Sequence, residues 1–256
     1  MRSMDTFIQK IAKEAGAAVL KRFGKDGIHY MKSEGSWDGV TKADLLSEKI
    51  IISGIHRAYP DHGIISEESG VEKKHAEYRW IIDPIDGTSN FVNGIPFFGV
   101  LIALAHKKKV ILSAVYLPAT KELFFAKRGK GAYRNGKRIR CSNKKDWKSS
   151  LGCVPAILDD RTVVFFKGFM DQAKGKGLVI NNFGSANGVY VALGRRDWCV
   201  SIGAHLWDYA PGFLILKEAG CTVTDLKGKP WQMGDRELMA ANPRLHKQLL
   251  KLTKGI

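Results

Sequence analysis

The sequence contains few of the residues that mark disulfide-rich or zinc-binding proteins. Its 256 residues include 4 cysteines and 7 histidines. The cysteines form no C-x-x-C pair, and the histidines form neither H-x-x-x-H nor H-E-x-x-H. These spacings argue against a zinc site. We therefore expect reduced, structural thiols at Cys141, Cys153, Cys199 and Cys221.

Long apolar runs are also missing. No stretch approaches the roughly 18 apolar residues that indicate a membrane-spanning helix, and residues 1–24 lack the apolar core of a secretory signal peptide. Apolar residues instead recur with helical spacing from Ile8 to Phe23, and Gly24 follows them, which predicts an amphipathic helix. We expect a cytoplasmic protein without membrane contact.

Acidic residues are the third deficit. The chain has 25 aspartates and glutamates against 41 lysines and arginines, a net charge of +16. Such an excess attracts polyanions, so nucleic acid is one candidate partner. No nucleic-acid-binding motif accompanies the basic clusters, however, and aromatic residues are not interleaved with them. A solvated basic surface that helps to attract an anionic substrate is the favoured interpretation.

The residues from Trp80 to Asn90 form the most informative stretch of the chain. Three apolar residues predict the end of a buried strand, and Pro84 is expected to stop its regular pairing. Asp83 and Asp86 lie at this point. At roughly 5 Å and an effective dielectric of about 20, two carboxylates repel each other by about 3 kcal/mol. A divalent cation such as Mg²⁺, which prefers oxygen ligands, relieves this repulsion.

A turn composition follows the two acids. Gly87, Thr88 and Ser89 are typical of a tight turn that opens a helix. Backbone amides at a helix N-terminus attract anions, so we expect a phosphate site beside the metal. Taken alone, a D-x-x-D-G pattern is explained equally well by a metal site and by a structural role in which Asp83 caps a turn and Asp86-Gly87 forms an ordinary loop.

Two adjacent glutamates, Glu67 and Glu68, end a strand predicted at 64–66. Neighbouring side chains on a strand point to opposite faces, so only one of them can face a metal shared with Asp83. Glu68 is interpreted as a solvated acid, or as one that lies behind the metal ligands.

Two more acids stand at the start of predicted helices. Asp44 opens a helix over 41–58 that is expected to bury Leu45, Ile52 and Ile55. Asp208 opens another that reaches about residue 219, with Pro211 expected in its first turn, where a missing N–H costs nothing. By themselves, both acids are also explained as helix N-terminal residues.

Five segments together resemble the signatures of the inositol monophosphatase family of metal-dependent phosphatases. They are 83–88 (D-P-I-D-G-T), 207–212 (W-D-Y-A-P-G), 66–69 (S-E-E-S), 40–44 (V-T-K-A-D) and 184–187 (G-S-A-N). The resemblance extends along almost the whole chain. Ser66, Asn187 and Pro211 depart from the family pattern, each at a place where the family has a small residue.

The resemblance implies two or three Mg²⁺ ions with a defined set of ligands. The implied metal ligands are Glu67, Asp83, the Ile85 carbonyl, Asp86 and Asp208. The implied catalytic residues are Glu67, Thr88 and Asp44, with Thr88 and Asp44 accepting a proton from the attacking water. The implied substrate-binding residues are Ile85, Asp86, Gly87, Thr88, Gly184, Ser185, Ala186, Ser201 and Asp208.

The activity implied is that of a phosphomonoesterase in which a metal-activated water attacks a small phosphorylated metabolite such as inositol monophosphate. Inositol-specific relatives have a glutamate in the strand before W-D, where this chain has Ser201. Activity on fructose 1,6-bisphosphate, histidinol phosphate or 3′-phosphoadenosine nucleotides therefore remains an alternative. A basic nucleic-acid-binding protein with vestigial phosphatase motifs is a further alternative. The resemblance also implies lithium sensitivity and a homodimer.

The expected fold is of the α+β class, a layered α-β-α-β-α sandwich as in the inositol monophosphatases and fructose-1,6-bisphosphatases. Residues 1–141 would form a half with the main metal site, and residues 142–256 a half that supplies Asp208 and substrate-facing residues. Asn135-Gly136 predicts a two-residue hairpin, an interpretation preferred over a phosphate-binding loop at Gly131 to Lys137 because Arg138 replaces the required Ser or Thr.

Overall fold

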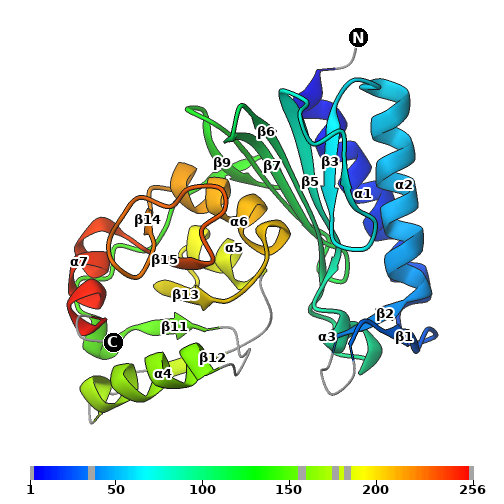
Figure 1. Ribbon diagram of the computed structural model, residues 1–256. Helices are drawn as coiled ribbons and strands as arrows, with labels where there is room; N and C mark the ends of the chain where they lie inside the picture. The colour runs from blue at the N-terminus through cyan, green and yellow to red at the C-terminus, as the bar shows by residue number, and fades with distance from the viewer. Residues whose placement is uncertain (1–2, 34–37, 155–159, 175–178, 182–185, 254–256) are drawn as a thin grey trace.

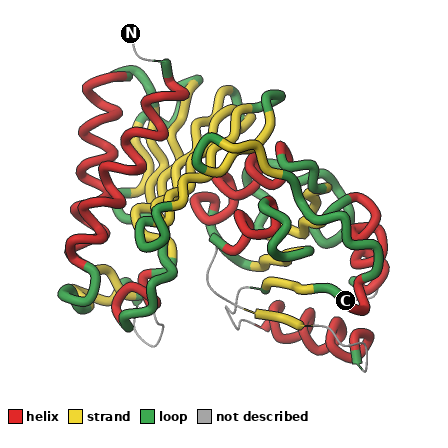
Figure 2. Tube along the Cα trace, turned by 180° about the vertical axis from the view of Figure 1, so that it is seen from behind, coloured by secondary structure: helices red, strands yellow, loops and turns green. Residues whose placement is uncertain are grey.

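The protein is described by a computed structural model that covers residues 3–33, 38–154, 160–174, 179–181 and 186–253. It has five layers, in the order helices, sheet, helices, sheet, helices (Figure 1). Seen from behind, the strands of the larger sheet lie between a pair of long helices and the helices of the middle layer (Figure 2). The α+β sandwich expected from the sequence is confirmed.

The first layer consists of α1 (Met4–Arg22) and α2 (Lys42–Ala58). Ser3 and Thr41 cap their N-termini through side-chain oxygens, as a helix start requires. The prediction that Leu45 faces inward is wrong, because this residue is 36% exposed, whereas the predicted burial of Ile55 is confirmed. The buried residues of α2 are Ala43, Asp44, Ser47, Glu48, Ile51 and Ile55.

The second layer is an eight-stranded sheet with the order β10-β9-β8-β7-β6-β5-β3-β4. Only β3 and β5 pair in parallel. The strands are β3 (Gly63–Ser66), β4 (Gly70–Glu72), β5 (Tyr78–Asp86), β6 (Gly99–His106), β7 (Lys109–Leu117), β8 (Glu122–Lys127), β9 (Gly131–Arg134) and β10 (Lys137–Ile139). The predicted β9–β10 hairpin is confirmed, with positive φ at both Asn135 and Gly136.

Regular pairing of β5 is interrupted at Pro84, as expected, but the strand does not end there. Its pairing with β6 continues to Asp86, which lies opposite Gly99, and the register shifts between Asp83 and Asp86. Proline is tolerated within a sheet where a bulge interrupts the hydrogen-bond ladder. The irregularity thus changes the direction of the strand without ending it.

Two helices of the second half form the middle layer: α5 (Asn187–Ala192) and α6 (Leu206–Glu218). Helix α6 packs directly on the larger sheet, and its apolar residues share one core with strands β5 to β9. The helix begins at Leu206, so Pro211 lies in its second turn. The prediction that Pro211 lies in the first turn is therefore wrong. Pro211 is buried in this second turn.

The smaller sheet has the order β12-β11-β13-β15-β14, and the outermost layer covers its other face. Its strands are β11 (Leu151–Cys153), β12 (Val179–Asn181), β13 (Trp198–Ile202), β14 (Thr222–Thr224) and β15 (Glu237–Ala241). The outermost helices are α4 (Asp160–Ala173) and α7 (Pro243–Leu252). Sequence reasoning missed β15 and β4, because a short run such as Glu237 to Ala241 has little β-branched or aromatic character.

Three short elements gather at one end of the larger sheet. They are β1 (Ile28–Met31), β2 (Gly39–Thr41) and α3 (Thr88–Val92). Strand β1 pairs antiparallel with β2, which leads into α2, while α3 directly follows β5. Among the described residues, no helix has the length and apolar character that crossing a membrane demands.

Candidate active site

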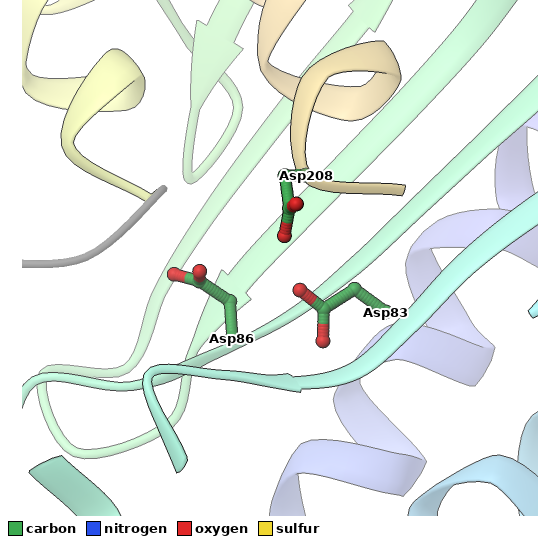
Figure 3. Close-up of side chains that lie close together, drawn as sticks. All are labelled: Asp83, Asp86 and Asp208. Atoms are coloured by element: carbon green, nitrogen blue, oxygen red, sulfur yellow. The ribbon is translucent and has the colours of Figure 1, made fainter. Parts of the chain in front are cut away.

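Three carboxylates from the two halves of the chain meet at this end of the sheet. Asp83 and Asp86 belong to β5, and Asp208 lies in the first turn of α6. One carboxylate oxygen from each lies within 4.8 Å of the other two. Figure 3 shows the side chains pointing toward one another. We call this group the acid cluster.

The acid cluster has little water around it. Asp83 and Asp86 are buried, and Asp208 is partly buried. Burial, reinforced by the charges of Glu67, Asp86 and Asp208, raises the pKa of Asp83 well above its usual range. Burial, followed by the charge of Asp86, raises the pKa of Asp208 to about 8. Three carboxylates in these surroundings cannot all ionise without a compensating cation.

A divalent cation fits these residues. Oδ1 of Asp83 is buried and has no hydrogen-bond partner, and a buried acceptor without a partner costs free energy. All-oxygen donors with several negative charges are the ligands that Mg²⁺ prefers. The donor set and the orphaned oxygen therefore favour a magnesium site between the three aspartates.

Backbone amides hold two of these aspartates in place. Oδ2 of Asp86 accepts a hydrogen bond from the amide of Ala186 at 2.8 Å. Oδ2 of Asp208 accepts one from the amide of His205 at 2.6 Å, which closes a capping box at the start of α6. Asp208 is thus both a helix N-terminal acid and a member of the acid cluster, two interpretations that the sequence had left as alternatives.

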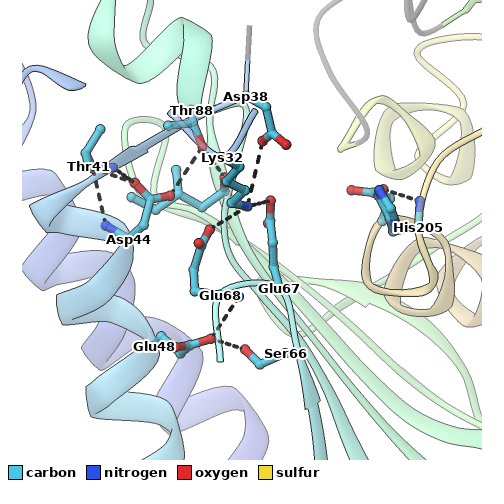
Figure 4. A network of polar contacts seen from close by, with 12 residues as sticks. Lys32, Asp38, Thr41, Asp44, Glu48, Ser66, Glu67, Glu68, Thr88 and His205 are labelled. Atoms are coloured by element: carbon cyan, nitrogen blue, oxygen red, sulfur yellow. Dashed lines mark hydrogen bonds and ion pairs between the residues drawn. The ribbon is translucent and has the colours of Figure 1, made fainter. Parts of the chain in front are cut away.

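Glu67, whose charge acts on Asp83, lies next to Lys32 (Figure 4). Its Oε1 is 2.7 Å from Nζ of Lys32, and Oε1 of Glu68 is 2.9 Å from the same nitrogen. Burial of Lys32 opposes its charge, but these two carboxylates outweigh burial and raise its pKa. The charge of Glu67 contributes to the raised pKa of Asp83. Its role as a metal ligand stays a prediction.

Glu68 is not a solvated acid. Its side chain is 4% exposed, and its Oε2 is buried without a hydrogen-bond partner. Burial raises the pKa of Glu68 to about 7. The interpretation as an acid that supports the site from behind fits this position, because Glu68 shares Lys32 with Glu67.

Sequence reasoning missed two residues of α2 that support the site. Glu48 accepts hydrogen bonds from the hydroxyl of Ser66 and, at 3.2 Å, from the amide of Glu68. Ser47 donates to the Pro84 carbonyl at 2.8 Å. One signal was available: Ser47 and Glu48 follow Asp44 by three and four residues, so all three lie on one helix face, and that face also carries apolar residues.

Thr88 connects Asp44 to the end of β5. Its Oγ1 lies 2.9 Å from the Ile85 carbonyl oxygen and 3.3 Å from Oδ1 of Asp44. The other carboxylate oxygen of Asp44 accepts the amide of Thr41 at 2.8 Å. Burial raises the pKa of Asp44 to about 6. The structure therefore brings together Thr88 and Asp44, the two residues that the resemblance pairs in one step of the reaction.

Gly87 sets the direction of α3. It stands at the N-cap with φ of +83°, a left-handed conformation that favours glycine. A Cβ at this position would also lie 3.1 Å from the Phe97 carbonyl oxygen. The predicted helix start at Thr88 is confirmed, and it lies two residues beyond Asp86.

The remaining predicted substrate-facing residues come from the second half. Ala186 reaches the site through its bond to Asp86, whereas Gly184 and Ser185 lie outside the described residues. Ser201 lies on β13 and is half-buried. The hydroxyl of Tyr209, which directly follows Asp208 on α6, donates to the Arg236 carbonyl at 3.0 Å and accepts the amide of Ala204 at 3.2 Å.

With this geometry in view, the sequence was compared with known proteins. The profile of the inositol monophosphatase family matches residues 1–256. The chain belongs to the inositol monophosphatase family. The resemblance stated from the motifs is thus confirmed, and the acid cluster of this family member lies where its two signature segments meet.

The relatives of this inositol monophosphatase family member carry more than one kind of name. The chain is 34% identical over 255 residues to the Nus factor SuhB of Escherichia coli, covering 98% of this chain and 95% of the relative. It is 33% identical over 253 residues to the fructose-1,6-bisphosphatase/inositol-1-monophosphatase of Thermotoga maritima, with 98% and 95% covered. One relative is thus named as a phosphatase and the other as a Nus factor, so the names differ in the function that they state.

The fold matches that of solved members of the family. The crystal structure of the extragenic suppressor protein SuhB from Bartonella henselae superposes with a TM-score of 0.90 at 32% identity, and 98% of each chain is covered. The inositol monophosphatase of Thermotoga maritima gives a TM-score of 0.87 at 32% identity, with 97% of this chain and 95% of the other covered.

Proposed function

We propose that this protein is a Mg²⁺-dependent phosphomonoesterase that hydrolyses a small phosphorylated metabolite. The observation that carries the proposal is the acid cluster, in which Asp83, Asp86 and Asp208 approach within 4.8 Å while burial raises the pKa of Asp83 and Asp208. Such a group gains most from binding a divalent cation, and a phosphatase uses one.

Asp83, Asp86 and Asp208 would hold the metal, with Glu67 and the Ile85 carbonyl at the margin of the same site. When bound, the metal ions supply charge that activates water and stabilises the phosphate and leaving oxygens. Lys32 keeps Glu67 and Glu68 close together by pairing with both. Because Lys32 is a cation, it also offsets the local excess of negative charge that would otherwise repel a phosphate.

Thr88 and Asp44 would take up the proton of the attacking water. The hydroxyl of Thr88 lies within hydrogen-bond distance of Oδ1 of Asp44, so it can pass a proton to that oxygen as it accepts another. A pKa of about 6 for Asp44 suits a general base that works near neutral pH. The amides at the start of α3, at Gly87 and Thr88, would bind the phosphate oxygens.

The substrate class follows from what the site offers. Its features recognise a phosphate group, whereas Ser201, where inositol-preferring relatives have a glutamate, presents only a short hydroxyl. Inositol monophosphate is the first substrate to test, and bisphosphates, histidinol phosphate and phosphoadenosine nucleotides follow. By analogy with the family we further propose a cytoplasmic homodimer that is inhibited by lithium.

The deciding experiment is phosphate release from a panel of these phosphoesters, with and without chelator. EDTA should abolish hydrolysis, and added Mg²⁺ should restore it. Mg²⁺ should also raise the melting temperature of the chelated protein, because binding to the folded state alone stabilises it. Full activity in excess chelator would rule out the mechanism, whichever substrate is hydrolysed.

The alternative of a vestigial enzyme that only binds nucleic acid predicts a different result. A protein of that kind would hydrolyse none of the phosphoesters and would not be stabilised by Mg²⁺. The acid cluster argues against it, because three buried carboxylates in close contact destabilise a fold that has no use for them.

A further inference from the structure

The positive charge of the protein is concentrated in one quarter of the chain. Residues 87–145 contain 13 lysines and arginines and a single acid, Glu122, and therefore carry 12 of the net 16 charges. These residues form strands β6 to β10 and the segment that follows them. The excess charge thus belongs to one side of the larger sheet and is not spread over the whole surface.

The strand register brings much of this charge to one end of the sheet. The β6–β7 turn follows His106, which pairs with Lys109. The β8–β9 turn follows Lys127, which pairs with Leu112 near the start of β7. Both turns therefore project from the same end, and β10 ends beside them. We call the exposed cations at this end the basic end: Lys108, Lys109, Lys130, Arg138 and Arg140.

The acids at this end are engaged by other groups. Asp5 pairs with Lys127 at 2.7 Å, Glu77 pairs with Lys107 at 3.0 Å, and Glu218 accepts the amides of Gly129 and Gly131 at 2.8 Å each. Within the described ranges, none of the five basic-end residues takes part in an ion pair. Their charges therefore face solvent without an ion-pair partner among the described residues.

The basic end lies far from the acid cluster. On β6, Gly99 pairs with Asp86 in the acid cluster, whereas His106 leads into the basic turn seven residues later. At about 3.3 Å per residue, this separation is about 23 Å. Helix α6 runs between the same two places, from Asp208 in its first turn to Glu218, which bonds the β8–β9 turn. A small substrate at the acid cluster does not reach the basic end.

The side chains of the basic end favour one class of negatively charged partner over the others. Membrane surfaces and protein partners are usually bound with exposed apolar side chains as well as charge. Residues 107–140 contribute none of the large apolar side chains that the described structure exposes. Unpaired lysines and arginines on projecting turns suit the phosphodiester backbone, which is bound mainly through charge.

We propose that the basic end is a second binding site, separate from the acid cluster, for the phosphodiester backbone of a nucleic acid. Binding there is largely independent of base sequence, because the charges on the projecting turns contact phosphates. It is also independent of the phosphatase reaction. The proposal does not rest on the proposed function, because its test uses no substrate.

The test compares two variants that each remove three positive charges. The first is Lys108→Gln/Lys109→Gln/Lys130→Gln at the basic end. The matched control is Lys227→Gln/Lys229→Gln/Lys247→Gln, whose lysines are exposed on the other half. Fluorescence anisotropy measures the binding of a labelled 20-nucleotide uridine RNA at several salt concentrations.

We expect the first variant to weaken RNA binding at least 10-fold at about 150 mM salt and the control variant to weaken it less than about 3-fold. The slope of log K against log salt should fall by about 2 in the first variant, since each lost phosphate contact removes about 0.7. An unchanged melting temperature would show that the first variant is folded.

Three results would overturn the proposal. Equal losses in both variants would mean that net charge alone attracts RNA. Competition by polyglutamate as effective as competition by unlabelled RNA would assign the site to acidic protein segments. Binding to vesicles with 30 mol% phosphatidylserine, in the absence of RNA binding at the same salt, would assign it to a membrane surface.

Discussion

At the scale of single residues, the site is a compromise between stability and chemistry. Asp208 illustrates it: its carboxylate is held by the amide of His205, yet burial and the charge of Asp86 raise its pKa to about 8. Without a cation, the charged form of this residue is therefore disfavoured in the folded protein. The same feature makes the residue useful, because a cation bound there gains a strong ligand.

Asp208→Asn keeps the shape of the side chain and removes its charge. We expect kcat to fall at least about 100-fold, roughly 3 kcal/mol of barrier, because one metal ligand is lost. The melting temperature in EDTA should not fall, because removing a carboxylate relieves repulsion within the acid cluster. The increase in melting temperature caused by Mg²⁺ should become smaller, because the variant has lost a metal ligand.

The control is Asp171→Asn, an exposed aspartate of α4 in the same half of the chain. It should leave kcat and the Mg²⁺-dependent rise in melting temperature unchanged. Near-normal kcat in Asp208→Asn would remove Asp208 from the metal site. A clear loss of kcat in Asp171→Asn would show that the assay reports general damage.

At the scale of elements, a close contact between two strands holds the smaller sheet together. Gly152 of β11 pairs with Trp198 of β13, and a Cβ on Gly152 would lie 2.0 Å from a ring carbon of Trp198. The indole is fully buried, and its Nε1 donates to Ser150 at 2.9 Å. The indole therefore cannot move aside without losing both packing and a hydrogen bond.

Gly152→Ala should lower the free energy of unfolding by about 1–3 kcal/mol, the usual cost of overpacking a core. Urea denaturation measures this as a lower midpoint with an unchanged slope. Gly27→Ala is the matched control, because no other heavy atom lies within 4 Å of the Cβ that it adds. A Gly152→Ala protein as stable as the wild type would mean that β11 and β13 are less tightly packed than described.

At the scale of the whole molecule, one apolar core crosses the boundary expected near residue 141. Ile81, Leu101 and Val115 of the larger sheet belong to the same cluster as Leu214 and Ile215 of α6. The acid cluster also takes residues from both sides of that boundary. Neither half can bury its apolar surface alone, so the division into 1–141 and 142–256 describes the order of the chain better than two independent folding units.

We therefore expect the chelated protein to unfold in one transition. Differential scanning calorimetry should give a single peak whose calorimetric and van't Hoff enthalpies agree. Two resolved peaks would show that the halves unfold separately. A fragment of residues 1–141 should expose the face that α6 covers and should aggregate when it is expressed alone.

Much of the molecule could be predicted from local sequence. The amphipathic pattern of α1, the capping residues of α2 and the Asn135-Gly136 hairpin are local features, and the structure confirms them. Leu45 and Pro211 were misplaced for a different reason. Their environment depends on which helix face meets the sheet and where the helix begins, and neither is encoded by nearby residues alone.

By itself, the sequence determined the acids available to bind metal and the motifs that resemble the family, because these depend on spacing within short segments, and the resemblance implied the layered fold. The tertiary structure decided which acids meet. Asp83, Asp86 and Asp208 form one cluster, while Lys32 engages Glu67 and Glu68. It also decided that the basic turns lie at the far end of the sheet. Electrostatic interactions depend on distance and burial, and only the packed chain sets these quantities.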